Sequence, residues 1–485
     1  MDSLRIPGGI PEAWERTFAF CAPQLVDPDS DLSKQYPDLH QTFSTRLTAA
    51  LAARNNEPIS KCNHLHPETH TRFDSQEAQE TSRLSVREVY KKEDDLDCRR
   101  YKICADLRER AQIYGFIGAG TFATVFLARE KRSNKKTPEE QPRHYALKVE
   151  RANTILQAGE SDLHECPFTL LREEGADRYI PSEALILLLL TGCDRFPMLD
   201  SVYLDGCYQT IVMSPCVDYS PDRKPLKSNT YNRCFPGFTG RFLITQRNEP
   251  LLNEMQACKV ACQLLEAIAY MADMNMYHGD ISINNYVVDQ DLNNLANTNR
   301  LQVQLIDFGI VDFGLEHKDF QRGFFHFMAC HEYQMRPELA EELTLGSYQY
   351  DLHYHSEFSV RLHHDVRNVC LWKFAVSVFG ILHGYWPWDL TPEQGDLHLL
   401  DYNGGSSAGV DARRTRMMAQ PVEVANHLSD ECKEALQLML SRKPEDRPGI
   451  KRLLRQPWFQ KWKSVDGPLT RPYSKEFASS FITEA

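Results

Sequence analysis

Apolar and polar residues alternate from residue 113 through residue 130, in the run IYGFIGAGTFATVFLARE. The charged stretch KRSNKKTPEEQPR interrupts this alternation, which resumes in HYALKVE at residues 144–150. A period of two is typical of half-buried strands, and a polar stretch between two such runs is typical of a loop. The pattern therefore predicts two strands, a loose loop and a third strand.

Longer apolar runs predict buried elements elsewhere in the chain. IPSEALILLLL begins with a Pro-Ser start signal and stays apolar, as a buried helix would. YQTIVMSPCVDYS predicts a buried strand that runs into a linker, and LQVQLIDFG predicts a further strand. Two more helices are predicted, at residues 251–276 and in WKFAVSVFGILHGYWPW, which ends at a glycine.

The first hundred residues show no sustained periodicity. Short helices are predicted at residues 12–20 and 32–52. The apolar anchors are few and scattered, which favours an extension laid over a neighbouring domain rather than an independent core; they are Trp14, Phe18, Phe20, Tyr36 and Phe43. No internal repeat is visible.

Composition narrows the class of protein. The 485 residues include 67 acidic and 55 basic side chains, and the net charge of −12 argues against a general binder of nucleic acids or anionic membranes. The N-terminus lacks a basic head followed by an apolar core, and the longest apolar run, residues 184–190, is too short to span a bilayer. Fourteen cysteines without a C-x-x-C pair indicate free thiols in a reducing compartment. We therefore expect a soluble intracellular protein, cytoplasmic by default.

A glycine pair marks a candidate phosphate site. Gly118 and Gly120 fill the first two positions of a G-x-G-x-x-G pattern, and Ala123 stands at the third. Glycines at a strand turn allow backbone N–H groups to point at phosphates. Lys148 follows in YALKV, and a lysine buried in an apolar strand needs an anionic partner. The pattern favours binding of the α- and β-phosphates of a nucleotide by Lys148.

A helical glutamate is the expected partner of Lys148. Glu183 is preferred because it opens the predicted helix at residues 180–190. Glu173 and Glu174, in LLREEG, remain alternatives.

The run YHGDISINNYVVD, residues 277–289, has the spacing of a protein kinase catalytic loop. Asp280 would orient the substrate hydroxyl, and Asn285, five positions later, would hold a metal ion. Asp307, in the DFG that follows the strand LQVQLI, would chelate magnesium. A second DFG begins at Asp312, but Asp307 is preferred because a predicted strand leads directly into it.

Two motifs far apart in the chain agree with this interpretation. Arg336, Pro337 and Glu338 stand where the activation segment of a kinase ends in Ala-Pro-Glu. Glu338 would need a buried cation, and Arg447 in RKPEDRPGIKRLLRQPWF is the match. We therefore expect a buried pair between Glu338 and Arg447.

These motifs predict an α+β, two-lobed protein kinase fold that uses ATP and Mg²⁺. The expected divisions are an extension packing on the kinase domain (1–100), a small β-rich N-lobe (101–216), a large helical C-lobe (217–465) and a tail (466–485). Asp280, Lys148, Asn285 and Asp307 are the expected catalytic residues, the last two of these as metal ligands. The nucleotide is expected to contact Ile117, Gly118, Gly120, Val125, Ala146, Lys148, Glu183, Met213, Ser214 and Cys216. Ser214 and Cys216 would offer backbone groups to the base.

The sequence resembles the Bub-type mitotic spindle checkpoint kinases in GAGTFATVF, with alanine at the third glycine position, in HGD, and in its long N-terminal arm. The resemblance implies a serine/threonine kinase of the cell cycle that acts in the nucleus, at kinetochores. Its implied partners are protein substrates such as histones or kinetochore proteins, with no direct contact to nucleic acid or membrane, and the chain would be monomeric or partner-bound.

One position departs from that family. Most serine/threonine kinases carry a lysine two residues after the catalytic aspartate, and Ser282 stands there. Losing a positioned cation from a charge-stabilising site typically costs on the order of ten- to a thousand-fold in rate. Two hypotheses follow: an active protein kinase, or a pseudokinase scaffold that keeps the fold, binds nucleotide and serves as an interaction platform.

Overall fold

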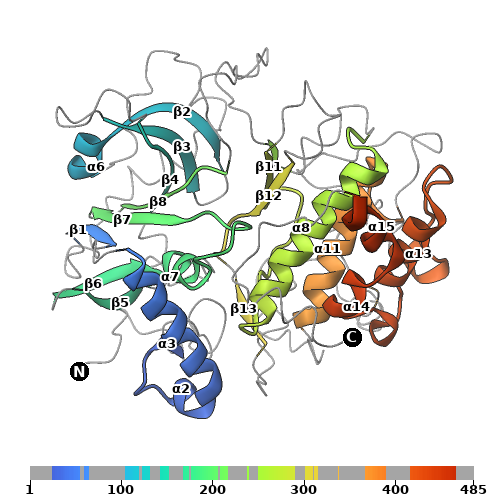
Figure 1. Ribbon diagram of the computed structural model, residues 1–485, viewed down its shortest axis with the longest axis horizontal. Helices are drawn as coiled ribbons and strands as arrows, with labels where there is room; N and C mark the ends of the chain where they lie inside the picture. The colour runs from blue at the N-terminus through green and yellow to red at the C-terminus, as the bar shows by residue number, and fades with distance from the viewer. Residues whose placement is uncertain are drawn as a thin grey trace. The chain divides into compact units, whose positions relative to one another are not determined.

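The structure is a computed structural model, and its chain divides into two compact units. Unit 1 comprises Met1–Thr191 and Pro197–Pro236, and unit 2 comprises Gly192–Phe196 and Gly237–Ala485. The residues that the structure describes (Figure 1) are 25–54, 59–64, 104–119, 123–131, 142–151, 168–173, 176–205, 208–216, 238–239, 250–289, 301–309, 311–314, 337, 366–388 and 415–465.

A six-stranded sheet in the order β1-β7-β8-β4-β3-β2 is the frame of unit 1. Its pairs are antiparallel except for β1, which runs parallel to β7. The predicted strands at residues 113–150 and from residue 208 are confirmed. The strands are β1 Ser60–His64, β2 Ala111–Ala119, β3 Ala123–Glu130, β4 His144–Arg151, β7 Leu199–Asp205 and β8 Tyr208–Met213.

The alternating apolar residues of these strands form a core with a short helix. They pack with α6, Ala105–Arg110, and the cluster comprises Cys104, Leu107, Ala111, Phe126, Ala128, Tyr145, Leu147, Val149, Tyr203 and Val212. A hairpin of β5, Phe168–Glu173, and β6, Ala176–Pro181, leads into α7, Ser182–Leu189. Every residue of α7 is buried, which confirms the helix predicted from IPSEALILLLL.

Two helices, α2 (Asp31–Gln35) and α3 (Pro37–Ala52), occupy the described residues where one helix was predicted at residues 32–52. The break lies at Pro37 because a proline disfavours helical backbone in the residue before it and is well placed at the first position of a helix. Phe43 of α3 is fully buried, and α3 packs against α7. The helix predicted at residues 12–20 lies outside the described residues.

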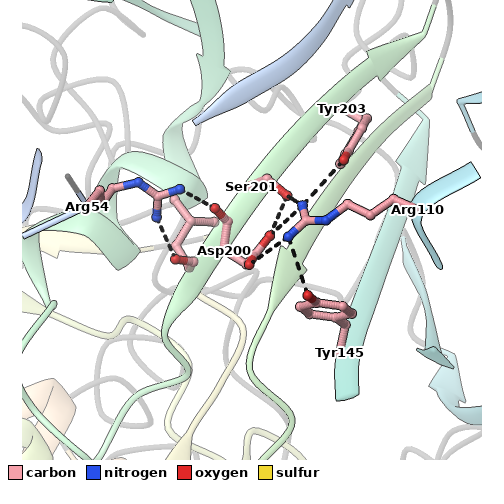
Figure 2. Close-up of polar contacts among 7 residues, drawn as sticks. Arg54, Arg110, Tyr145, Asp200, Ser201 and Tyr203 are labelled. Atoms are coloured by element: carbon pink, nitrogen blue, oxygen red, sulfur yellow. Dashed lines mark hydrogen bonds and ion pairs between the residues drawn. The ribbon is translucent and has the colours of Figure 1, made fainter. Parts of the chain in front are cut away.

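Two arginines fasten the extension and α6 to β7 (Figure 2). Arg54, just after α3, donates to the carbonyl oxygens of Leu199, at 2.9 Å, and Asp200. Arg110, at the end of α6, forms an ion pair of 2.9 Å with the Asp200 carboxylate. The same guanidinium donates to three hydroxyl groups, those of Tyr145, Ser201 and Tyr203. Asp200 is therefore a shared anchor for both segments.

Unit 2 is built on two long helices, α8 and α11, which pack side by side (Figure 1). The predicted helix at residues 251–276 is shorter in the structure because Asn253 caps its start in a capping box with Gln256. The elements are β9 Phe238–Thr239, α8 Glu254–Ala272, β10 Met276–Tyr277, β11 Tyr286–Asp289, β12 Gln302–Leu305, β13 Asp312–Phe313, α11 Val366–His383, α13 Asp430–Met439, a 3₁₀ turn Pro444–Asp446, α14 Ile450–Leu454 and α15 Pro457–Val465.

The end of α11 confirms the predicted stop at a glycine. Gly384 has a φ of 77°, a left-handed conformation that glycine adopts without the strain a side chain would add. Unit 2 also contains two small sheets of short strands, one in the order β12-β11-β9 and one formed by β10 and β13. Within the described ranges, every helix is too short or too polar to traverse a lipid bilayer.

A buried histidine at the end of α11 predicts loss of stability at acidic pH. His383 Nδ1 donates to the carbonyl oxygen of Phe379 at 2.9 Å, and His383 Nε2 accepts from the Ala425 N–H at 3.0 Å. Burial lowers the pKa of His383 from 6.5 to about 4. As the pH falls, His383 is therefore protonated in the unfolded chain before it is protonated in the folded chain. The stability present above pH 6.5 is lost as the pH falls to about 4. The loss attributable to this group is about 3 kcal/mol.

His383→Gln, which removes the titratable ring and keeps an acceptor for the Ala425 N–H, is the matched variant. We expect the unfolding free energy of the wild type to fall more steeply between pH 7 and pH 4 than that of His383→Gln, measured by urea unfolding. Parallel curves for the two proteins would show that His383 is not responsible.

Candidate active site

The candidate nucleotide residues lie in unit 1, around Lys148 on β4. Its Nζ is 2.6 Å from Oε2 of Glu183, in the first turn of α7. The Glu183 side chain is 2% exposed, and a carboxylate so buried requires a cationic partner. Of the three glutamates considered, the structure thus pairs Glu183 with Lys148. Glu173 lies on β5, and Glu174 falls outside the described residues.

Strand register gathers the other expected nucleotide contacts on one face of the sheet. Val125 of β3 pairs with Gly118 of β2 on one side and with Lys148 on the other. Ala146, two residues before Lys148, shares its face and pairs with Met213 of β8. The structure therefore lines up an apolar surface beside the lysine ammonium, which suits a base linked to phosphates.

The first glycine segment is described only in part. The pairing of β2 with β3 shifts between Phe116 and Gly118, so Ile117 occupies the irregular position and is 38% exposed. Gly120 lies outside the described residues.

The segment after β8 limits what Ser214 can offer a base. The Ser214 N–H donates to the carbonyl oxygen of Met198 at 2.8 Å, and the Met198 N–H donates to the Ser214 Oγ at 2.8 Å. The main-chain group that Ser214 could present is therefore its carbonyl oxygen. Cys216 is partly exposed.

Two of the expected catalytic residues, Asp280 and Asn285, lie in unit 2, in the loop between β10 and β11. Asn285 Nδ2 donates to Oδ2 of Asp280 at 2.7 Å and to the Asp280 carbonyl oxygen at 2.9 Å. The other carboxylate oxygen of Asp280, Oδ1, is buried and accepts no hydrogen bond from the described residues. A buried acceptor without a donor is costly, so it is suited to receive a hydroxyl group from a bound molecule.

His278 supports this loop from behind. Its Nε2 donates to the carbonyl oxygen of Ile306 at 2.8 Å, and its ring contacts Phe308 edge-on. Burial holds the pKa of His278 below its ordinary value, which keeps the ring neutral at physiological pH. The loop is thereby tied to the strand that leads to Asp307.

Lys373 of α11 is a second support, and it was not identified from the sequence. Its Nζ donates to the carbonyl oxygen of Gly279 at 2.6 Å, and the residue is 1% exposed. Gly279 precedes Asp280 and has a φ of 74°. The signal that could have found Lys373 is a lysine inside the apolar run of a buried helix, because a buried ammonium requires an acceptor.

The pairing of β11 with β12 brings the two expected metal ligands, Asn285 and Asp307, near each other. The Ile306 N–H donates to the carbonyl oxygen of Asn285 at 2.9 Å, which places Asp307 one residue beyond this contact. Asn285 Nδ2 is engaged with Asp280, so its Oδ1 is the atom left to coordinate, and the Asp307 side chain is exposed. Amide and carboxylate oxygens are the ligands that Mg²⁺ prefers, so these residues fit the ion. Asp312, the alternative, lies on β13 opposite Tyr277.

Ser282 and Glu338 are the remaining positions singled out from the sequence. Ser282 is buried, and its Oγ accepts from the Asn284 N–H at 3.3 Å, so no cation stands at this position of the loop. Glu338 lies outside the described residues, and its pairing with Arg447 stays a prediction.

Comparison with known proteins gives one family and distant relatives. Residues 239–459 match the protein kinase domain family. Fatty acyl-CoA synthetase and RNA processing-associated kinase 1 of Saccharomyces cerevisiae (strain ATCC 204508 / S288c) is 20% identical over 221 residues, 46% of this chain and 21% of the relative. Sperm motility kinase 2A of Mus musculus is 22% identical over 219 residues, 45% of this chain and 34% of the relative. The matched regions thus span between a fifth and about a third of these relatives.

These matches support a protein kinase. The matched family region contains Asp280, Asn285 and Asp307, whereas Lys148 and Glu183 precede it. None of the matches singles out the Bub-type checkpoint kinases, so that resemblance stays a prediction.

Proposed function

We propose that this chain is an active serine/threonine protein kinase that transfers the γ-phosphate of ATP to protein hydroxyl groups. Unit 1 corresponds in this proposal to the small β-rich lobe and unit 2 to the large helical lobe of the kinase fold. The family match over residues 239–459 supports the kinase assignment. The observation that carries the proposal further is the buried, open Oδ1 of Asp280, held in place through Oδ2 by Asn285.

Asp280 would act on the substrate hydroxyl. Its Oδ1 would accept the hydroxyl hydrogen bond and the proton, while the bond from Asn285 to Oδ2 fixes the orientation of the carboxylate. Asn285 Oδ1 and Asp307 would hold Mg²⁺, which when bound neutralises phosphate charge. Lys148, oriented by Glu183, would bind the α- and β-phosphates.

Substrate and location are proposed from the resemblance to the checkpoint kinases. The Ala123 variant of the glycine loop and the HGD at His278 support histone or kinetochore substrates and a nuclear location during the cell cycle. The net charge of −12 is compatible with basic protein substrates.

Ser282 favours a second candidate, a pseudokinase scaffold that binds nucleotide and partner proteins. The serine is buried and supplies no charge to a transferring phosphoryl group. A scaffold would still bind ATP, so nucleotide binding and phosphoryl transfer must be measured separately.

Nucleotide binding is expected to require Lys148. ATP with Mg²⁺ should raise the melting temperature of the wild type by about 5 °C or more at a hundredfold excess over Kd, because a ligand that binds only the folded state stabilises it by about 2.7 kcal/mol. Lys148→Met should lose most of this rise, since it removes the cation to which this proposal assigns the phosphates.

Lys131→Met, which removes an exposed lysine of the same unit, is the control and should respond as the wild type does. Equal responses of Lys148→Met and the wild type would refute the assignment of Lys148.

A further inference from the structure

Lys148 faces a second carboxylate besides Glu183. Its Nζ lies 3.0 Å from Oε1 of Glu150, on the same strand. Residues 148 and 150 project from the same face of β4 because side chains alternate along a strand. All three side chains are largely buried, with exposures of 10% for Lys148, 11% for Glu150 and 2% for Glu183.

Glu150 is held in this position from the other side. Gln209 of β8 pairs with Glu150 in the strand register, and its Nε2 donates to Oε2 of Glu150 at 2.5 Å. Gln209 is fully buried. One carboxylate oxygen therefore contacts Lys148 and the other is fixed by a neutral donor.

The local charge balance works against phosphate binding. One ammonium and two carboxylates leave this group of three side chains with a net charge of −1. A polyphosphate brings further negative charge, and its attraction to the ammonium is opposed by both carboxylates in a poorly solvated environment. The phosphates must compete with a glutamate for Lys148.

Glu150 is the partner that can give way. Its contact with Lys148 is longer than that of Glu183, 3.0 Å against 2.6 Å, and its side chain is less buried. When Lys148 turns to a phosphate, Glu150 keeps the hydrogen bond from Gln209 and does not become an unpaired buried anion. Glu183 in the first turn of α7 would remain the orienting partner.

We propose that Glu150 sets the nucleotide affinity of this chain by competing with phosphate for Lys148. This inference rests on the proposed function, because it takes Lys148 as the phosphate ligand. Glu150→Gln keeps the shape and removes the competing charge. We expect it to lower the Kd for ATP with Mg²⁺ on the order of tenfold, to lower the Kd for ADP as well, and to leave the Kd for adenosine within about twofold.

The test is calorimetric titration of the wild type, Glu150→Gln and Glu150→Ala with ATP plus Mg²⁺, ADP and adenosine. Glu109→Gln, which removes an exposed carboxylate from α6 of the same unit, controls for net charge and should bind as the wild type does. The increase in ATP affinity of the Glu150 variants over the wild type should become smaller as salt is raised from about 0.05 to 0.5 M. Salt screens the repulsion between Glu150 and phosphate that these variants remove.

The outcomes separate the two proposals. Equal or weaker ATP binding by both Glu150 variants overturns the role of Glu150, and the kinase proposal then stands if the wild type transfers phosphate. ATP binding that tightens in the Glu150 variants supports the inference even if the wild type transfers no phosphate. An equal increase in affinity for adenosine would contradict the role of Glu150, since adenosine carries no phosphate. Absence of ATP binding in every protein would overturn both proposals.

Discussion

Replacing Asp280 with asparagine is expected to lower the rate of protein phosphorylation by about 10²- to 10⁴-fold, the usual contribution of a positioned general base. Asparagine fills the same space but cannot accept a proton from the substrate hydroxyl. The bond from Asn285 to position 280 fixes the side chain, so the amide would occupy the place of the carboxylate without its charge. Steady-state rates with a histone mixture and labelled ATP measure the loss.

The affinity for ATP should change little in this variant, because the expected phosphate ligand is Lys148. Asp430→Asn alters an exposed aspartate of unit 2 and should keep the wild-type rate. A rate for Asp280→Asn within about threefold of the wild type would remove Asp280 from the proposed mechanism.

Replacing Arg447 with alanine is expected to destabilise unit 2 by about 3 to 5 kcal/mol. The guanidinium is buried, and it donates to the carbonyl oxygens of Ser441, at 2.9 Å, and Arg442, at 3.4 Å. Its Cζ also lies 4.4 Å from the ring centre of Trp372, over the face of a large buried side chain. Alanine removes the cation–π contact and leaves the carbonyl groups without these donors.

Thermal and urea unfolding measure this effect. Arg442→Ala is the matched control, because Arg442 is exposed and accepts from Arg447 through its main-chain carbonyl oxygen, which the substitution keeps. The control should melt close to the wild type. If Arg447→Ala melts within one or two degrees of the wild type, Arg447 is not a buried anchor of this unit.

Local patterns were sufficient to predict most elements. The alternation around Lys148 and the apolar run after Glu183 specify a strand and a buried helix without outside help. The ends of the helices depended on finer signals. Asn253 caps α8, so the helix begins three residues after the predicted start at residue 251, and Pro37 divides the helix predicted at residues 32–52. These signals are visible in the sequence, but apolar periodicity alone does not weigh them.

Contacts between segments far apart in the chain could not be predicted from the sequence patterns. The bond from Lys373 to Gly279 joins residues 94 positions apart, and the donation of the Ser214 N–H to Met198 depends on how β7 meets β8. Glu150 was within reach of sequence reasoning, since alternation places it on the same face as Lys148. What the pattern could not supply was the buried Gln209 that turns Glu150 toward the lysine.

Transfer of the γ-phosphate from labelled ATP to a protein mixture is the most direct measurement of whether this chain is an active kinase. Purified wild type should label serine and threonine residues of histones in the presence of Mg²⁺, with loss of the label on chelation, while Asp280→Asn run beside it gives the background. Labelling of the wild type no greater than that of Asp280→Asn, from a protein that binds ATP with Mg²⁺, would contradict the proposed activity and leave the scaffold as the function of the fold.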